Sequence, residues 1–425
     1  MKKKITALLV LLALVLGCAI PALADETAEE AAASSGAASE PAADTAAEVE
    51  TVPDRVGFAS FENVESRMRA NNLKILSLQQ SIGTLEDIDY AELEEDLRDA
   101  LHSIVDQQWG MIQMEMLEPI AAKMTAATLE EQYDAVKEQL TDLREGKLQA
   151  DNAGIIRQIQ NAQNQIILAG ESTFIALKAM ETQEGALQRQ LTALNRTVEE
   201  MELRYQLGQI SALQLSEVKA GRSSLTSGLS TLRMNMEVYK AQLEQLLGAE
   251  ITGQISLGTI PTVTAEQVAA INPEADLAAY KEKSYELYEA KKTLEEAQEE
   301  FEDARDEYKA DEKKQEYRSA QRTWQAAQYT YNDTVQSCEL KFQTICRQVK
   351  DYQQIWEAAK VSLACQQESY KASELKFQQG TISQNALLTA GDDLRTAEEK
   401  VENAASDLFS AYNTYCWAVQ HGILN

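Results

Sequence analysis

The sequence is poor in histidine and in the residues that interrupt helices. Its 425 residues include only 6 Pro, 18 Gly and 2 His. Between Glu274 and Gln379 there is neither Gly nor Pro, so the backbone there presents no obstacle to a helix. Together with abundant Ala, Glu, Gln, Lys and Leu, this composition predicts long helices.

The scarcity of histidine and cysteine limits the chemistry that the chain can support. His102 and His421 lie far apart, which argues against catalysis based on histidine. No set of nucleophile, base and orienting residue can be assembled. The cysteines after the first 24 residues match no zinc or redox spacing: Cys338, Cys346, Cys365 and Cys416. We therefore expect no enzyme activity, no metal and no cofactor.

Long apolar runs are absent after the first 24 residues. Three lysines precede an apolar stretch over 5–20, and Ala22-Leu23-Ala24 then fits a signal-peptidase site. This predicts a signal peptide at 1–24 and an exported protein. Val15-Leu16-Gly17-Cys18 also resembles a bacterial lipobox, so lipidation at Cys18 is the alternative to ordinary cleavage.

Basic residues are outnumbered by acidic ones. The chain has 39 Lys and Arg against 68 Asp and Glu, for a net charge of −29. Such a charge argues against nucleic acid or an anionic membrane surface as a partner. Residues 25–50 contain no base and no aromatic residue, and they cannot bury enough apolar area to offset chain entropy. We expect an acidic disordered tether at 25–57, with folded sequence from Phe58.

One short stretch occurs twice. The copies read Leu203-Arg-Tyr-Gln-Leu-Gly208-Gln-Ile210-Ser211 and Leu375-Lys-Phe-Gln-Gln-Gly380-Thr-Ile382-Ser383. A Gly just past a helical run suits a left-handed C-terminal cap, and a Ser three residues later can cap the next helix. Each copy therefore predicts the tip of a helical hairpin, and the duplication strengthens this interpretation.

Apolar residues on both sides of the tips recur at helical spacing. A heptad pattern runs along the residues that lead to the first tip: Ile159, Ile166, Thr173, Met180, Leu187, Leu194 and Met201. These seams predict an all-α fold of two long antiparallel coiled-coil hairpins that arose by duplication. The first repeat would span 58–248 and the second 273–425, with a linker at 249–272.

Within the repeats, we expect a helix over 61–82, a helix over 87–124 packed on the main bundle, and nearly continuous helix over 129–206. One unbroken helix over 274–379 would be about 159 Å long. That is far longer than its return partner, so we place a break at the polar stretch 308–315.

This layout resembles the TolC-like outer-membrane efflux family. In that family each half has a leading helix with an Asn-rich start, a long helix, a tip of the form aromatic-x-x-Gly-x-x-Ser, and a return helix that ends near Leu-Gly. Asn71-Asn72 and Asn272-Pro273 match the leading helices, and Leu247-Gly248 matches the first return helix. The tips match at Tyr205, Gly208 and Ser211, and at Phe377, Gly380 and Ser383.

The sequence departs from the family in two respects. Neither half shows the alternating apolar strands of about 10 residues that form the family's transmembrane β-strands, so we expect no transmembrane β-barrel. A single-membrane bacterium would have no use for one. Family members also often carry acidic residues six and nine positions after the tip Gly. Here these positions hold Gln214, Glu217, Ala386 and Thr389, so an acidic ring at the entrance is not expected.

The resemblance implies the exit-duct component of an export or efflux system in the bacterial cell envelope. Three copies would close a twelve-helix conduit. Its tips would dock a membrane-fusion-type adaptor protein, which would join it to a cytoplasmic-membrane transporter. The candidate partner-binding residues are Tyr205, Gly208, Ile210, Ser211, Phe377, Gly380, Ile382 and Ser383. The alternative is a surface-tethered coiled-coil spacer or scaffold without a lumen, which leaves the matched tips unexplained.

The hairpin register also places two cysteines at one height. If the second hairpin turns near residue 381, Cys346 and Cys416 each lie 35 residues from the turn. An exported protein can keep disulfides. A Cys346–Cys416 bridge is therefore one interpretation, and two unpaired, buried thiols are the other.

Overall fold

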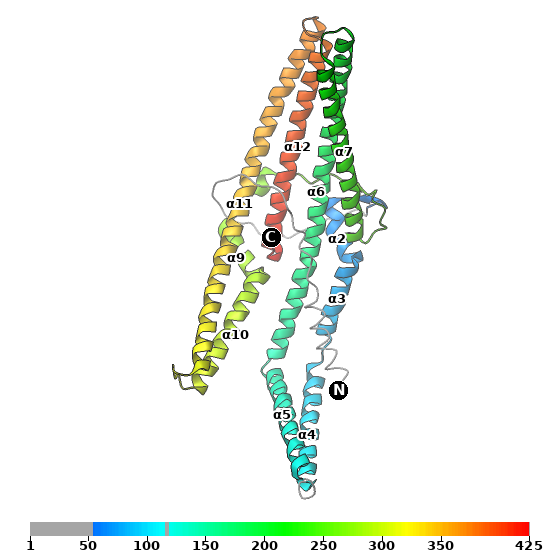
Figure 1. Ribbon diagram of the computed structural model, residues 1–425. Helices are drawn as coiled ribbons and strands as arrows, with labels where there is room; N and C mark the ends of the chain where they lie inside the picture. The colour runs from blue at the N-terminus through cyan, green and yellow to red at the C-terminus, as the bar shows by residue number, and fades with distance from the viewer. Residues whose placement is uncertain (1–53, 115–118, 425) are drawn as a thin grey trace. The chain divides into compact units, whose positions relative to one another are not determined.

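The structure, a computed structural model, describes residues 54–114 and 119–424 (Figure 1). The signal peptide at 1–24, the lipidation of Cys18 and the tether up to residue 53 lie outside the described residues. The described chain is almost wholly helical, which confirms the all-α prediction. Its two short strands, β1 (Phe58–Ala59) and β2 (Ser256–Leu257), pair in parallel.

The first half contains six described helices: α2 (Phe61–Asn71), α3 (Leu73–Glu86), α4 (Tyr90–Met114), α5 (Pro119–Arg144), α6 (Lys147–Gln206) and α7 (Ala212–Leu246). The second half follows with α8 (Ala265–Ala269), α9 (Pro273–Lys283), α10 (Tyr285–Glu307), α11 (Gln315–Gln378) and α12 (Gln384–His421). Within 54–114 and 119–424, no helix combines the length and apolar character needed to cross a membrane.

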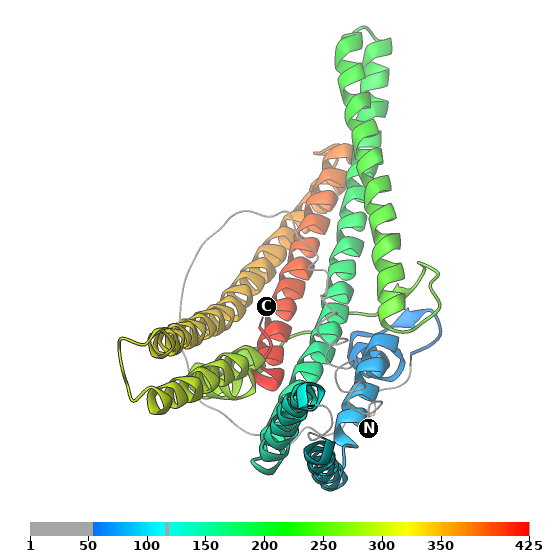
Figure 2. The ribbon, with the colours of Figure 1, turned by 60° about the horizontal axis from the view of Figure 1, so that its bottom comes forward.

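Two kinds of antiparallel pair are formed. Towards the tips, α6 packs on α7 and α11 packs on α12, as the duplicated sequence predicts (Figure 1). Away from the tips, α4 packs on α5 and α10 packs on the first part of α11 (Figure 2). We call these second pairs the first and the second arm. Each half thus continues past its leading helix into an arm and then returns along its long helix to the tip.

The first arm differs from the sequence prediction. The helix expected over 129–206 is divided at Gly146, whose φ of +78° ends α5 and begins α6. The single helix expected over 87–124 is wrong: residues 90–114 form α4, residues 119–124 belong to α5, and α4 packs on α5 rather than on the main bundle. The apolar contacts of the arm centre on Leu97, Leu140 and Leu143, and Leu148 at the start of α6 packs against them. An amphipathic helix needs an apolar partner, and sequence spacing does not say which neighbour supplies it.

The second arm turns where the sequence is most polar. Helix α10 ends at Glu307 and α11 begins at Gln315, which confirms the predicted break. Lys309 and Ala310 take up the reversal with φ of +51° and +56°. Both lack the freedom of glycine, so the sequence marks this turn by its polarity and not by a residue that favours positive φ.

The folded chain begins slightly before the predicted end of the tether. Asp54 accepts hydrogen bonds from the Ser60 backbone N–H (3.0 Å), Asn63 Nδ2 (2.9 Å) and an Arg67 guanidinium nitrogen (3.0 Å). Its carboxylate thereby lies over the start of α2, where the N-terminal helix dipole favours a negative charge. Residues 54–57, which the sequence assigned to the tether, are thus held against this helix.

The leading helix of each half breaks after 11 residues, at Asn72 in the first half and at Ser284 in the second. Asn72 caps α3 and Ser284 caps α10. Asn272 instead caps the start of α9, as Ser60 precedes α2. The sequence match between Asn71-Asn72 and Asn272-Pro273 is therefore wrong: Asn72 caps the second helix of its half, α3, whereas Asn272 caps the first helix of its half, α9. Asn suits the start of any helix, so residue type does not distinguish the two.

The end of each return helix packs against the point where the leading helix of the same half breaks. A Cβ on Gly248 would lie 2.4 Å from the Asn71 carbonyl oxygen, and a Cβ on Gly422 would lie 2.3 Å from the Lys283 carbonyl carbon. Asn72 Nδ2 also donates to the Leu246 carbonyl oxygen (2.8 Å). We call these two contacts the glycine joints. They fix the lower end of α7 and of α12 to the leading helices.

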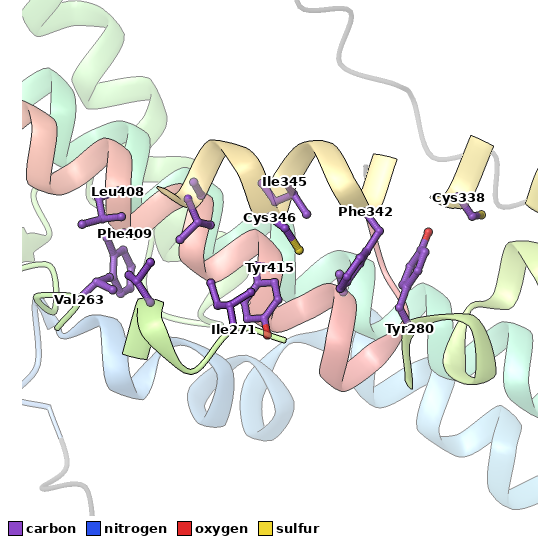
Figure 3. Packing of buried hydrophobic residues seen from close by; sticks show 14 of the residues in the cluster. Val263, Ile271, Tyr280, Cys338, Phe342, Ile345, Cys346, Leu408, Phe409 and Tyr415 are labelled. Carbon is purple, nitrogen blue, oxygen red and sulfur yellow. The ribbon is translucent and has the colours of Figure 1, made fainter. Parts of the chain in front are cut away.

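The core of the second half lies where α8, α9, α11 and α12 meet (Figure 3). The Tyr280 and Phe342 rings stack with centroids 5.4 Å apart, and the Phe342 and Tyr415 rings lie 6.2 Å apart. The predicted register puts Gln420 level with Phe342. The observed contact with Tyr415 is five residues away, or about 7 Å of helix rise.

All four cysteines in the described part of the chain are free thiols, so the structure contains no Cys346–Cys416 bridge. Cys346 is buried in the core, and Cys416 is partly buried against it. The shifted register offers a reason, because it moves the two residues out of level and a disulfide needs Cα atoms within about 7 Å. Burial raises the pKa of Cys346 to about 12 and of Cys416 to about 11, so both are inert thiols at neutral pH.

The glycine joints predict a contrast between the two ends of α7. Gly208 and Gly248 have nearly the same φ, +70° and +64°, but an added Cβ meets no atom within 4 Å at Gly208. Gly208→Ala should cost about 1 kcal/mol of unfolding free energy, from backbone strain. Gly248→Ala should cost about 1–3 kcal/mol more, from the clash with Asn71. Urea unfolding followed by circular dichroism measures both, and equal losses would contradict the close packing.

Candidate docking surface at the hairpin tips

The first tip closes with two backbone hydrogen bonds. The Gly208 N–H donates to the Tyr205 carbonyl (2.9 Å) and the Gln209 N–H donates to the Arg204 carbonyl (2.9 Å). This is the Schellman arrangement, which requires a residue with positive φ and therefore favours glycine. The predicted C-terminal cap is thus confirmed.

The second tip has the same geometry. The Gly380 N–H donates to the Phe377 carbonyl (2.9 Å), the Thr381 N–H donates to the Lys376 carbonyl (2.9 Å), and φ at Gly380 is +71°. An added Cβ meets no atom within 4 Å at either tip glycine. Within the chain, these glycines are needed for their φ and not for close packing.

A serine begins the return helix at each tip. Ser211 Oγ accepts from the Gln214 N–H and Ser383 Oγ accepts from the Ala386 N–H, both at 3.2 Å. At the first tip, Gln214 Oε1 also accepts from the Ser211 N–H (2.9 Å), which completes a capping box. Gln214 is the position where the resembled family often carries an acid, and here its side chain caps the helix instead.

The exposed apolar residues of the tips are largely not those chosen from the sequence. Ile210 and Ile382 are half-buried against the hairpins, whereas Tyr205 and Phe377 are exposed as expected. The first tip further exposes Leu203 (57%), Leu207 (64%) and Leu213 (69%), and the second exposes Leu375 (58%) and Leu388 (39%). The signal that sequence reasoning missed is that Leu203 lies outside the heptad positions that run from Ile159 to Met201.

The two tips are unequal in apolar surface. The duplicated alignment pairs Leu207 with Gln379 and Leu213 with Asn385. The first tip therefore presents four exposed apolar side chains near its turn, where the second tip has amides at two of the equivalent positions. Lys219 pairs with Glu202 across the first hairpin at 2.7 Å, so this basic side chain is neutralised within the chain.

The two hairpins contact each other through α6 and α12. Arg189 pairs with Glu399, and Arg196 pairs with Asp392. An open cavity of about 290 Å³ lies between these helices, lined mainly by charged side chains. Across 54–114 and 119–424, no cluster of three or more His, Cys, Asp or Glu side chains could hold a metal ion. The features that stand out near the tips are thus shape and apolar surface.

Comparison with known proteins gives a likeness of fold. No protein-family model matches the sequence, and no curated protein matches it. Among solved structures, the outer-membrane channel OprN matches with 12% identity over 85% of this chain and 90% of OprN, at a TM-score of 0.51. The outer-membrane channel CmeC from Campylobacter jejuni matches with 13% identity over 70% of this chain and 68% of its own, at a TM-score of 0.48. CusC matches with 13% identity over 85% of this chain and 96% of its own, at a TM-score of 0.47. The described chain thus has a fold similar to that of the outer-membrane channel OprN.

Proposed function

We propose that the protein is the exit-duct component of a bacterial export system. It would form an α-helical conduit in the cell envelope, with or without a lipid anchor at Cys18. Its tips would dock a membrane-fusion-type adaptor that joins it to a cytoplasmic-membrane transporter. The observation that carries this proposal is the pair of tips with one geometry, at the ends of two hairpins that α6 and α12 hold together. The fold shared with OprN, an outer-membrane channel, supports it.

A conduit requires several copies of the chain, and two helices offer free faces for this purpose. Because α6 and α12 join the hairpins within one chain, α7 and α11 are left on the outside of the pair. Away from the tips, at 100° per residue, the exposed apolar residues of α7 span about 140°, and those of α11 span about 120°. They are Met234, Val238 and Tyr239 on α7, and Tyr329, Leu340, Ile355 and Val361 on α11.

These two faces also match in height. Met234 lies 26 residues after Gly208, and Ile355 lies 25 residues before Gly380. By helix rise, both are about 38 Å from their tips. The α7 face of one copy therefore fits the α11 face of the next with all tips level. Such a contact joins different surfaces of the two copies and can close a ring. We propose a homotrimer of this kind.

The native Cys365 permits a direct test of this trimer. Cys365 is exposed and lies 15 residues before Gly380, and Ser223 is exposed and lies 15 residues after Gly208. Cys365 lies on the proposed face of α11, and Ser223 lies about 20° from the edge of the proposed face of α7. Ser223→Cys should therefore form disulfides with Cys365 of neighbouring copies under mild oxidation, and non-reducing gels should show a cross-linked trimer.

Two variants control the cross-linking. Ser216→Cys lies on the same face of α7, seven residues or about 10 Å nearer the tip, and should not cross-link. Cys365→Ser in the Ser223→Cys chain should abolish the product. Mass photometry of the unmodified chain gives the oligomeric state. A monomer or dimer would reject the duct and favour the tethered coiled-coil spacer, whereas a trimer without the cross-link would reject only the proposed faces.

The tips predict a second result, for adaptor binding. Leu207→Gln with Leu213→Asn gives the first tip the residues of the second. Each leucine is more than 60% exposed, so thermal stability should change little. If the adaptor buries both side chains, binding should weaken at least tenfold, because each buried leucine is worth about 1.5–3 kcal/mol. Gln379→Leu with Asn385→Leu is the reciprocal variant and should not weaken binding.

The measurement is affinity for the purified adaptor of the same export system, by biolayer interferometry. Leu229→Asn is the matched control for a loss of stability. Leu229 is buried in the same helix, so its replacement should lower thermal stability. Unchanged affinity of the Leu207→Gln, Leu213→Asn chain would mean that the first tip is a turn and does not bind the adaptor through these leucines.

A further inference from the structure

A buried carboxylate without a cationic partner joins the two halves of the chain. Glu171 lies on α6 and is 5% exposed. Its Oε2 accepts hydrogen bonds from Asn413 Nδ2 and Trp417 Nε1, both at 2.7 Å and both from α12. Glu171 forms no salt bridge with any described residue. Two neutral donors from the second half therefore hold an acidic group of the first half.

The charged groups around this contact do not neutralise it. Glu65 of α2 faces Glu171, and so does Cys416 of α12, a neutral thiol at pH 7. Burial raises the pKa of Glu171, the bonds from Asn413 and Trp417 lower it, and the charge of Glu65 raises it, with a net upward shift. A carboxylate in this position resists ionisation because water is excluded and too few donors replace it.

The nearest histidine does not supply a positive charge. The His421 ring lies against the Trp417 ring with centroids 4.5 Å apart. Burial lowers the pKa of His421, Glu65 raises it, and Arg69 and Lys283 lower it, with a net downward shift. The imidazole is therefore largely neutral at pH 7, and Glu171 remains unpaired.

A second buried carboxylate shows the opposite behaviour. Glu244 is 2% exposed and also has no cationic partner within the part of the chain that the structure describes. It accepts from the backbone N–H groups of Thr252, Gly253, Gln254 and Ile255 and from the Thr252 hydroxyl. Burial raises the pKa of Glu244, but these bonds outweigh it and the pKa is lowered overall. Five hydrogen-bond donors therefore stabilise the anionic form of Glu244, whereas Glu171 has two.

We propose that Glu171 is a pH-responsive tie between the two halves, which holds α6 to α12 more tightly in acid than in alkali. The folded chain binds the Glu171 proton more tightly than the unfolded chain does. The contribution of Glu171 to folding stability is therefore fully present below the ordinary pKa of 4.5. It is lost as the pH rises through the raised pKa of the folded state. For Glu244, the contribution is instead present above 4.5 and lost in acid. The tie does not depend on the protein being a duct.

The test compares Glu171→Gln with Glu244→Gln in thermal unfolding between pH 4.5 and 8. The glutamine at 171 can still accept from Trp417 and cannot ionise. Its melting temperature relative to the unmodified chain should rise with pH, by roughly 2 °C for each unit of pKa shift. Glu244→Gln should fall relative to the unmodified chain as the pH rises. Trp417→Phe, which removes one donor, should make the pH dependence steeper than in the unmodified chain.

Hydrogen exchange localises the effect. At pH 8, peptides from 163–175 and 408–421 should exchange faster in the unmodified chain than in Glu171→Gln, and at pH 5 the two chains should exchange alike. The proposal is overturned if Glu171→Gln changes stability by the same amount at every pH. It is equally overturned if the pH-dependent difference in exchange falls outside these two segments.

Discussion

The close contact at the glycine joints is the constraint on which the rest of the structure depends. An added Cβ at Gly248 or Gly422 would lie within 2.5 Å of the backbone at the break of a leading helix. The return helix of each hairpin can therefore end at only one height relative to the leading helix. Because α7 and α12 are fixed at these ends, the two tips are set by the lengths of the return helices, 35 and 38 residues. The duplicated hairpins are thus the parts of the chain whose position the glycine joints fix.

The arms are less constrained, and it is here that the halves differ. The first arm has apolar contacts centred on Leu97, Leu140 and Leu143. It meets the rest of its half mainly where α5 runs into α6, so its length can change without moving a joint or a tip. Lys147 and Asp151 of α6 reach Glu299 and Lys292 of α10 by ion pairs at 3.2 Å and 2.6 Å. These exposed pairs contribute little to stability, and they connect α6 to the second arm without fixing its size.

Features that depend on local chemistry could be predicted from the sequence. The tip glycines and the serine caps rest on what one residue type does to its own backbone, and the break at 308–315 rests on the polarity of a stretch too long to be one helix. Features that depend on distant partners could not. Asn72 and Asn272 both cap helices, so residue type did not reveal which helix each begins. Ile210 and Leu207 are equally apolar, and only the packing of the hairpin shows that the first is half-buried and the second exposed.

Duplication gives one chain two tips that can diverge while their turns stay the same. The turn needs Gly at one position and Ser three residues later, and both tips keep these. Leu207 and Leu213 lie on the outer surface, where no intramolecular contact restricts them, and the second tip has amides in their places. A ring built from such chains would alternate between more apolar and less apolar tips. A partner that binds apolar surface would then meet one preferred site for each chain rather than two equal ones, because affinity depends on a few buried anchors more than on the number of turns presented.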